Sequence, residues 1–309
     1  MKYIYEIEQQ GLLWVNITKQ EEKTLLSLQK RFSFDKQEIQ ESLPPLQRPK
    51  LVKRDGYYFI VLHFPVFDRK TRRLGFTEVD FFLNGSSLVS IHDDSLPIIG
   101  HFFNQCQKDS AVRDKYFQGT AAQLFLEVLN RLLDSIFPIL LHVNEDINAI
   151  NKILFTKIPD RKMAEEILRL KTNVVTFRRT MQGHKTVLDR LVSGAGRELS
   201  LQSYQNYINL AHQHLNEIWQ TLETQKESVD ALHETNESVV GLRMNEIMKT
   251  LTVISVITFP LTLVATIFSI GAVDTPFVHQ PFGFWIVSFL VLIGALAMLA
   301  VFKAKKWLD

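Results

Sequence analysis

Polar side chains follow one line along an apolar stretch near the C-terminal end of the chain. Alternate steps of three and four residues keep side chains on one face of a supercoiled helix. Of the six Ser and Thr residues between Leu251 and Ile270, only Thr258 lies off this line. We call the line the seam, and it comprises Asn245, Met248, Thr252, Ser255, Phe259, Thr262, Thr266 and Ser269.

The seam has two interpretations, and the residues alone leave both open. Small hydroxyl residues let membrane helices pack closely, and they bond to neighbouring helices or to their own carbonyls. The other interpretation is a pore in which the same side chains face water. Met248 and Phe259 would then form apolar rings, with Leu251 beside the seam, and such constrictions gate by dewetting.

The helix that carries the seam is predicted to cross a membrane. No Lys, Arg, Asp or Glu occurs from Thr250 to Val273, or from Thr275 to Phe302. Both runs exceed the roughly 20 apolar residues that a membrane helix needs. Two spans cannot surround a pathway, so a pore requires several identical chains. Pro260, in mid-span, removes the hydrogen bond to the Val256 carbonyl and favours a kink.

Charge and cysteine content suggest where each part lies. The start, MKYIYEIEQQ, lacks the apolar run of a secretory signal, so we expect the large N-terminal part in the cytosol. Lys303, Lys305 and Lys306 favour the cytoplasmic side after the second span, which leaves the turn near Ala272 outside. The single cysteine, Cys106, agrees with a reducing compartment. A net charge of +2 argues against a nucleic-acid partner.

The first hundred or so residues predict a mixed α/β domain. Asp55-Gly56 and Asn84-Gly85 each separate two strand-like runs, as tight hairpin turns do. The hairpins pair Leu51 to Arg54 with Tyr57 to Phe64, and Glu78 to Leu83 with Leu88 to His92, while helices are expected over Lys19 to Phe32 and Asp35 to Ser42.

Long helices are expected from Thr120 onward. One runs from Thr120 to Leu154, and another follows the Pro159-Asp160 cap as far as Ser193. A third begins near Ser200 and continues into the first span, a length of roughly 70 residues or about 100 Å. The predicted divisions are a cytosolic α/β domain (1–119), long antiparallel helices (120–199), a cytosolic stalk helix (200–249), a pore-lining transmembrane helix (250–273), an external loop (274–281), a second transmembrane helix (282–302) and a basic cytosolic tail (303–309).

Acidic residues continue the seam into the stalk. The same stepping meets Gly241, Ser238, Glu234, Ala231 and Glu227. A solvated face explains such charges equally well, but carboxylate rings around a vestibule would concentrate cations. Tandem acids at Asp93 and Asp94 follow His92, and solvation at a strand end explains them better than a hydrolase metal site.

Taken together, these residues resemble the family of CorA-type divalent-cation channels. The likeness rests on NEIMKTLTVISVITFPLTLVATIF (245–268), RPKLVKRDGYYFIVLHFP (48–65), EVDFFLNGSSLVSIHDD (78–94) and the final KAKKWLD, and it covers essentially the whole chain. It implies an α+β cytosolic domain, long helices and two C-terminal transmembrane helices in a funnel-shaped homopentamer. The implied partners are other copies of the chain, membrane lipid and metal cations.

The resemblance also assigns roles to individual residues. The family's pore positions correspond to Asn245, Met248, Leu251, Ser255, Phe259 and Thr262. Glu234 falls where some members carry an acidic residue at an intersubunit, metal-sensing site. Asp93 and Asp94 are candidate partners for it, and Glu227 is a further candidate on the same face.

The external mouth departs from the family pattern. Ser269, Ile270 and Gly271 stand where the family has Gly-Met-Asn, or Gly-Ile-Asn in its zinc-specific relatives. Magnesium gives up its water reluctantly, so a ring of Asn amides can hold the hydrated ion, whereas Gly271 offers only a carbonyl. Asp274 remains in the outer turn. Selectivity for Mg²⁺ therefore does not carry over with the architecture.

Two functional hypotheses follow. The first is a cation channel or transporter in the inner membrane of a bacterial or archaeal cell, with both termini cytoplasmic. The second is a non-conducting scaffold that responds to metal or binds a partner. An enzyme is disfavoured, because the nine histidines are dispersed and His212 and His214 do not share a helix face. No cofactor is implied beyond the transported or regulatory divalent cation.

Overall fold

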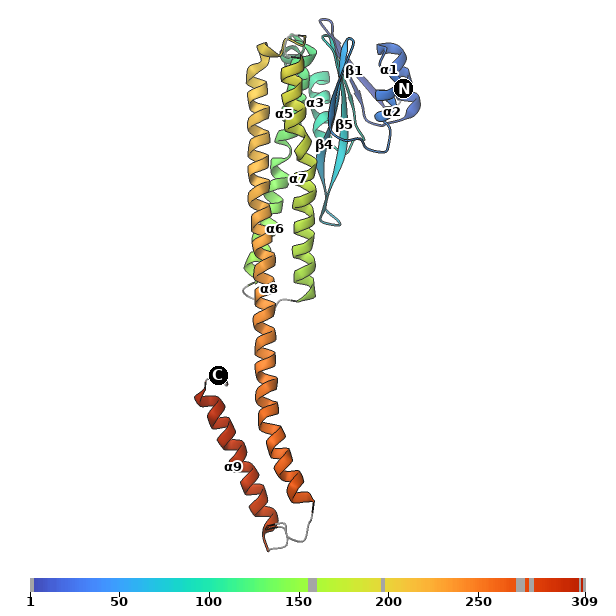
Figure 1. The fold of residues 1–309 in the computed structure, drawn as a ribbon. Helices are drawn as coiled ribbons and strands as arrows, with labels where there is room; N and C mark the ends of the chain where they lie inside the picture. The colour runs from blue at the N-terminus through green and yellow to red at the C-terminus, as the bar shows by residue number, and fades with distance from the viewer. Residues whose placement is uncertain are drawn as a thin grey trace. The chain divides into compact units, whose positions relative to one another are not determined.

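The structure, a computed structural model, describes residues 3–154, 160–195, 198–270, 276–277, 281–305 and 307 (Figure 1). The chain divides into two compact units, Met1–His233 and Glu234–Asp309. Each unit is described by itself below.

A six-stranded sheet forms the centre of the first unit. Its strands are β1 (Ile4–Gln9), β2 (Leu12–Ile17), β3 (Lys50–Arg54), β4 (Tyr57–Asp68), β5 (Arg73–Leu83) and β6 (Ser87–Ile91). The order is β1-β2-β6-β5-β4-β3, and β2 pairs with β6 in parallel while every other pair is antiparallel.

The two predicted hairpins are present, but their turns differ. Gly56 has a φ of 89°, which permits the tight turn from β3 to β4. The second connection, from β5 to β6, takes three residues instead of two. The Asn84 side chain holds this loop, since its Oδ1 accepts hydrogen bonds from the Ser86 and Ser87 backbone N–H groups at 2.9 and 2.6 Å.

Helices cover both faces of the sheet. The short helices α1 (Glu22–Phe32) and α2 (Lys36–Glu41) lie on one face, where Leu25 and Ile39 pack against alternate strand residues such as Phe59 and Phe82. The other face packs against α3 (Pro97–Lys108), α5 (Ala121–Asp134) and α7 (Arg161–Ala195), as Figure 1 shows. This alternation gives a three-layer α/β/α arrangement.

Two expectations about the helices need correction. The helix expected over Thr120 to Leu154 is interrupted, because α5 ends at Asp134 and α6 (Phe137–Leu154) begins three residues beyond it. Pro138 explains the break, since it has no N–H to donate and is tolerated only in a first helical turn. The strands expected in the first hundred residues are also followed by α3 and by α4 (Ser110–Phe117), which the sequence pattern did not indicate.

A helical bundle continues away from the sheet. Its core joins α6, α7 and the first part of α8 (Gln205–Ser269), with Ile147, Leu170 and Val229 among the buried contacts. Asp160 caps α7 by accepting a 2.9 Å hydrogen bond from the Met163 N–H, as expected. A 3₁₀ turn, Leu201–Tyr204, precedes α8, which then continues without interruption into the predicted first span and ends at Ser269.

The second unit contains the rest of α8 and the helix α9 (Gly283–Ala304). Both helices are long and apolar enough to cross a membrane. Many of their large apolar side chains are exposed, including Phe259 and Phe284 at 73% and 74%. Such surfaces require lipid or other copies of the chain to cover them.

Candidate functional site

One face of α8 packs against α9 within the second unit. Val253 is only 5% exposed, and Ile257, Leu261, Val264 and Phe268 are half-buried at helical spacing from it. A Cβ placed on Gly294 of α9 would lie 3.2 Å from Leu261 Cδ2, so the two helices approach closely there. This packed face defines the inner side of the helix pair.

The seam lies on the opposite face of α8. Thr262 follows Val253 by nine residues, which is a rotation of about 180° at 3.6 residues per turn. Thr252, Thr262, Thr266 and Ser269 are exposed, and Ser255 is half-buried. Within one chain, the line of polar side chains predicted from spacing is therefore left uncovered by α9.

Hydroxyl groups along the seam donate to their own helix. Thr252 and Ser255 donate to the carbonyls of Met248 and Leu251 at 2.7 and 2.8 Å. Thr262 and Thr266 do the same to the carbonyls four residues earlier, at 2.8 and 2.7 Å. Because each hydrogen is used within the helix, the outward side of each oxygen is an acceptor.

A row of acceptors suits hydrated cations. The waters around a cation direct their hydrogens outward, so they donate to such oxygens, whereas the shell of an anion presents oxygens instead. The geometry thus agrees with both earlier interpretations, since the hydroxyls bond to their own carbonyls and still face outward. What it adds is the sign of charge that the seam favours.

Apolar side chains interrupt the seam as expected. Phe259 is 73% exposed, Met248 53% and Leu251 55%, so all three project from the helix without cover from their own chain. Asn245 is also exposed and lies next to an ion pair between Arg243 and Glu246. Around an axis, Met248, Leu251 and Phe259 would make the narrow and apolar positions of a pathway.

The external mouth falls partly outside the described residues. Ser269 ends α8, and Ile270 follows in a turn with 71% exposure. Gly271 and Asp274, the residues whose chemistry departs most from the family pattern, are not among the described residues.

Acidic residues of the stalk differ in their partners. Glu223 pairs with Arg178 at 2.6 Å, and Asp230 pairs with Lys171 at 2.9 Å. The Lys171 ammonium, by hydrogen bonding, holds the pKa of Asp230 below its usual value. Glu227 and Glu234 are exposed, and the described residues provide neither of them with an ion pair. The acids on the seam are thus the uncompensated ones, a distinction that spacing alone did not reveal.

Asp93 and Asp94 shape the turn after β6. The Asp93 carboxylate accepts from the hydroxyl of Thr77 at 2.8 Å and from the N–H of Ser95 at 3.1 Å. Burial raises the pKa of Asp93, but hydrogen bonds from Ser95 and Thr77 outweigh it and hold the pKa below its usual value. Asp94 is exposed with a φ of 63°.

The His92 side chain stabilises the same turn. Burial lowers the pKa of His92 to about 4, so the ring is neutral at pH 7. Its Nδ1 accepts from the Asp94 N–H at 3.1 Å, which places the proton on Nε2, 3.1 Å from Asn16 Oδ1. Both ring nitrogens are thus occupied. Among the described residues, no three His, Cys, Asp or Glu side chains of one chain gather to hold a metal.

These features define the class of protein. An α/β domain, long helices and two apolar helices at the C-terminal end describe a membrane protein with a large water-soluble part. The family described as "CorA-like Mg2+ transporter protein" matches residues 9–306, and the chain belongs to this family. It is therefore an integral membrane protein of an ion-transporter family and not an enzyme.

Individual relatives match over nearly the full length. The "Putative metal ion transporter YfjQ" of Bacillus subtilis is 25% identical over 308 residues, which cover 99% of this chain and 93% of the relative. The "Cobalt/magnesium transport protein CorA" of Thermotoga maritima is 25% identical over 301 residues, covering 96% and 83%. The complete structure of the CorA magnesium transporter from Methanocaldococcus jannaschii has a TM-score of 0.83 at 20% identity, covering 98% of this chain and 94% of that one. The fold expected from the sequence is thereby confirmed.

Proposed function

We propose that this protein conducts divalent metal cations through a pore that α8 of each subunit lines in a homopentamer. The observation that carries the proposal is the position of the seam hydroxyls, on the face of α8 that α9 leaves uncovered. Five copies around an axis would turn this face inward and leave α9 to the lipid. The pore-lining residues in this proposal are Asn245, Met248, Leu251, Thr252, Ser255, Phe259, Thr262, Thr266 and Ser269.

We further propose the placement of the chain in the membrane. The spans are residues 250–273 and 282–302, the loop 274–281 is external, and both termini are cytoplasmic. The membrane is the inner membrane of a bacterium or archaeon. Lysines after the second span support this orientation.

Metal sensing is proposed for the acids of the stalk. Glu234 and Glu227 lack ion pairs among the described residues, so a divalent cation between subunits would compensate them. Asp93 and Asp94 of a neighbouring copy are the proposed partners. Cobalt and magnesium transport is named for the Thermotoga relative, which supports both ions as cargo without choosing between them.

Ion flux into liposomes tests the proposal. Purified protein should pass Mg²⁺, Co²⁺, Ni²⁺ or Zn²⁺ and exclude Na⁺. Phe259→Ala should raise the flux by several-fold, because it removes the most exposed apolar side chain of the seam. If neither the natural chain nor this variant passes any ion, the chain is instead a non-conducting scaffold.

The assignment of the external mouth is tested by introducing the residue that the family carries there. Gly271→Asn should shift selectivity toward Mg²⁺ and make the flux sensitive to hexammine complexes that mimic the hydrated ion. The adjacent Ile270→Met restores the family's other residue but provides no amide, so it serves as the control. Equal behaviour of the two variants would contradict the assignment of the mouth.

A further inference from the structure

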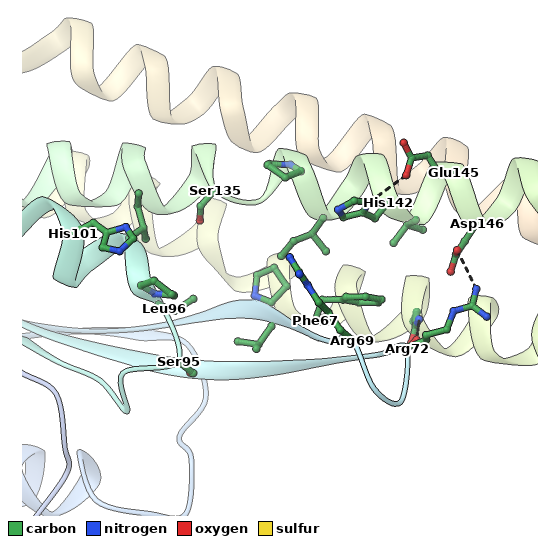
Figure 2. A pocket seen from close by; sticks show the side chains of 18 residues that line it. Phe67, Arg69, Arg72, Ser95, Leu96, His101, Ser135, His142, Glu145 and Asp146 are labelled. Carbon is green, nitrogen blue, oxygen red and sulfur yellow. Dashed lines mark hydrogen bonds and ion pairs between the residues drawn. The ribbon is translucent and has the colours of Figure 1, made fainter.

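A cavity of about 820 Å³ lies in the first unit (Figure 2). Its walls come from the end of β4, the start of α3, the junction between α5 and α6, and α7. Cavities of roughly 300 to 1,000 Å³ are usual for small organic ligands. The volume therefore exceeds what a single ion needs.

One arginine of the lining, Arg69, is exposed and has no recorded ion pair among the described residues, and the Glu145 carboxylate lines the same cavity. Arg72 is held by Asp146 and Glu166, each at 3.0 Å, and Arg169 shares the same two carboxylates. These four charges cancel within their own cluster. Arg69 follows β4 and reaches into the cavity in Figure 2, and no acceptor for its guanidinium is recorded among the described residues.

Further donors line the same space. Arg69 extends toward α6, which carries His142, and His101 lies at the end of the cavity near α3 (Figure 2). The His142 ring contacts Glu145 through Nδ1 at 3.2 Å, so its Nε2 remains for the cavity. The first turn of α3 also borders it, and the residue before that turn, Leu96, provides no side-chain cap. The positive end of that helix adds to the field of Arg69.

Between these groups the lining is apolar and flat. Phe67, Pro97, Pro138 and Ile139 contribute to it. Such surfaces bury an organic body, while a planar guanidinium fits the oxygens of a phosphate in a bidentate way. The anionic part of one ligand would contact the guanidinium, and its apolar part would contact these apolar side chains.

We propose that this cavity binds a phosphorylated small molecule of about nucleotide size, with a phosphate group between Arg69 and His142. Arg69 supplies the fixed charge, and the His142 ring supplies a second polar contact through Nε2. Phe67 and the prolines contact the organic part of the ligand. The proposal is independent of ion conduction, because it concerns the first unit alone.

Calorimetric titration of the full chain in detergent tests the proposal. ADP and ribose 5-phosphate are the probes, and divalent cations are left out because ADP chelates them. At least one probe should bind in the micromolar to millimolar range, and adenosine, which lacks the phosphate, should bind at least ten-fold more weakly. Absence of binding by both phosphorylated probes up to 10 mM would overturn the proposal.

Two variants locate the site. Arg69→Ala should weaken binding of the phosphorylated probe by about ten-fold or more, and His142→Ala by several-fold. Arg73→Ala is the matched control, since Arg73 is an exposed arginine of the same hairpin that does not line the cavity. Equal losses from Arg69→Ala and Arg73→Ala would indicate non-specific attraction and contradict the proposal.

Discussion

At the scale of single residues, the seam hydroxyls differ from the hydroxyl beside them. Thr262 lies on the seam, and Thr258 lies one turn earlier, off the line and in the same apolar helix. Both are exposed in the single chain. At 100° per residue the two threonines lie about 40° apart on α8, so the pair tests how narrow the seam is.

The first prediction compares these two threonines. Thr262→Val should lower cation flux by several-fold, because valine keeps the shape and removes the acceptor oxygen. Thr258→Val should leave flux nearly unchanged. The measurement is initial uptake rate into liposomes at equal protein density. Equal losses in both variants would favour the helix-packing interpretation of these hydroxyls.

A second residue, Asp80, has a carboxyl group buried within the sheet. Asp80 of β5 is fully buried, and neither of its carboxylate oxygens has a hydrogen-bond partner among the described residues. The nearby Ser42 hydroxyl donates instead to the Glu38 carbonyl at 3.1 Å. Burial, together with the charge of Glu78, raises the pKa of Asp80 well above its usual value. Folding therefore favours the protonated form of Asp80.

The second prediction is a pH dependence of stability. Above the unfolded pKa of about 3.9, the folded chain holds one proton more than the unfolded chain, so the free energy of unfolding falls by about 1.4 kcal/mol per pH unit. The fall ends at the raised folded pKa. Asp80→Asn should remove this fall, so the variant gains thermal stability relative to the natural chain as the pH rises above about 3.9. Asp55→Asn, at an exposed turn, should show no such gain; parallel curves for the natural chain and Asp80→Asn would contradict the prediction.

At the scale of elements, α7 meets the segment before β3 at a glycine. A Cβ on Gly183 would lie 2.5 Å from Pro49 Cβ and 2.9 Å from its Cγ, closer than real atoms approach. The proline ring cannot rotate away. Gly194, in the same helix, has nothing within 4 Å of such a Cβ.

The third prediction compares alanine substitutions at Gly183 and Gly194. Gly183→Ala should destabilise the chain by about 1–3 kcal/mol, because helix and proline must separate. Gly194→Ala should be neutral or stabilise by up to about 1 kcal/mol, since alanine is the better helix former. Thermal midpoints in detergent measure both. A stable Gly183→Ala variant would show that Pro49 does not constrain α7.

The sequence predicted elements that depend on local chemistry. Asp55-Gly56 set a hairpin because glycine permits the required φ, and the seam appeared because its period is a helix property. The parallel pairing of β2 with β6 could not be predicted from the sequence, because these strands are some 70 residues apart and no local pattern indicates their contact. The same holds for the cavity, which four or more distant segments form, and for the ion pair between Lys171 and Asp230, which joins two helices distant in sequence.

At the scale of the whole molecule, the exposed apolar faces of α8 and α9 call for both lipid and other copies. The fourth prediction is that native mass spectrometry from mild detergent yields an assembly of five chains of 35.7 kDa each. Monomers or dimers under all detergent conditions would contradict the pentameric pore. A closed ring is required because one chain supplies only one lining helix.

The fifth prediction concerns orientation. Cys106 is fully buried, and burial raises the pKa of its thiol to about 11, so the natural chain should resist thiol reagents. In intact cells, an impermeant maleimide should therefore label Phe277→Cys from outside. It should label Trp307→Cys only after lysis. The reverse pattern would invert the proposed topology.

The hydroxyls of the seam also bear on how the protein is made. A polar line facing lipid is costly when its donors are unsatisfied, but here the hydroxyls of Thr252, Ser255, Thr262 and Thr266 already donate within α8. A newly synthesised chain can therefore enter the bilayer alone and wait there for its partners. For the proposed pore, these internal hydrogen bonds would allow assembly to follow insertion.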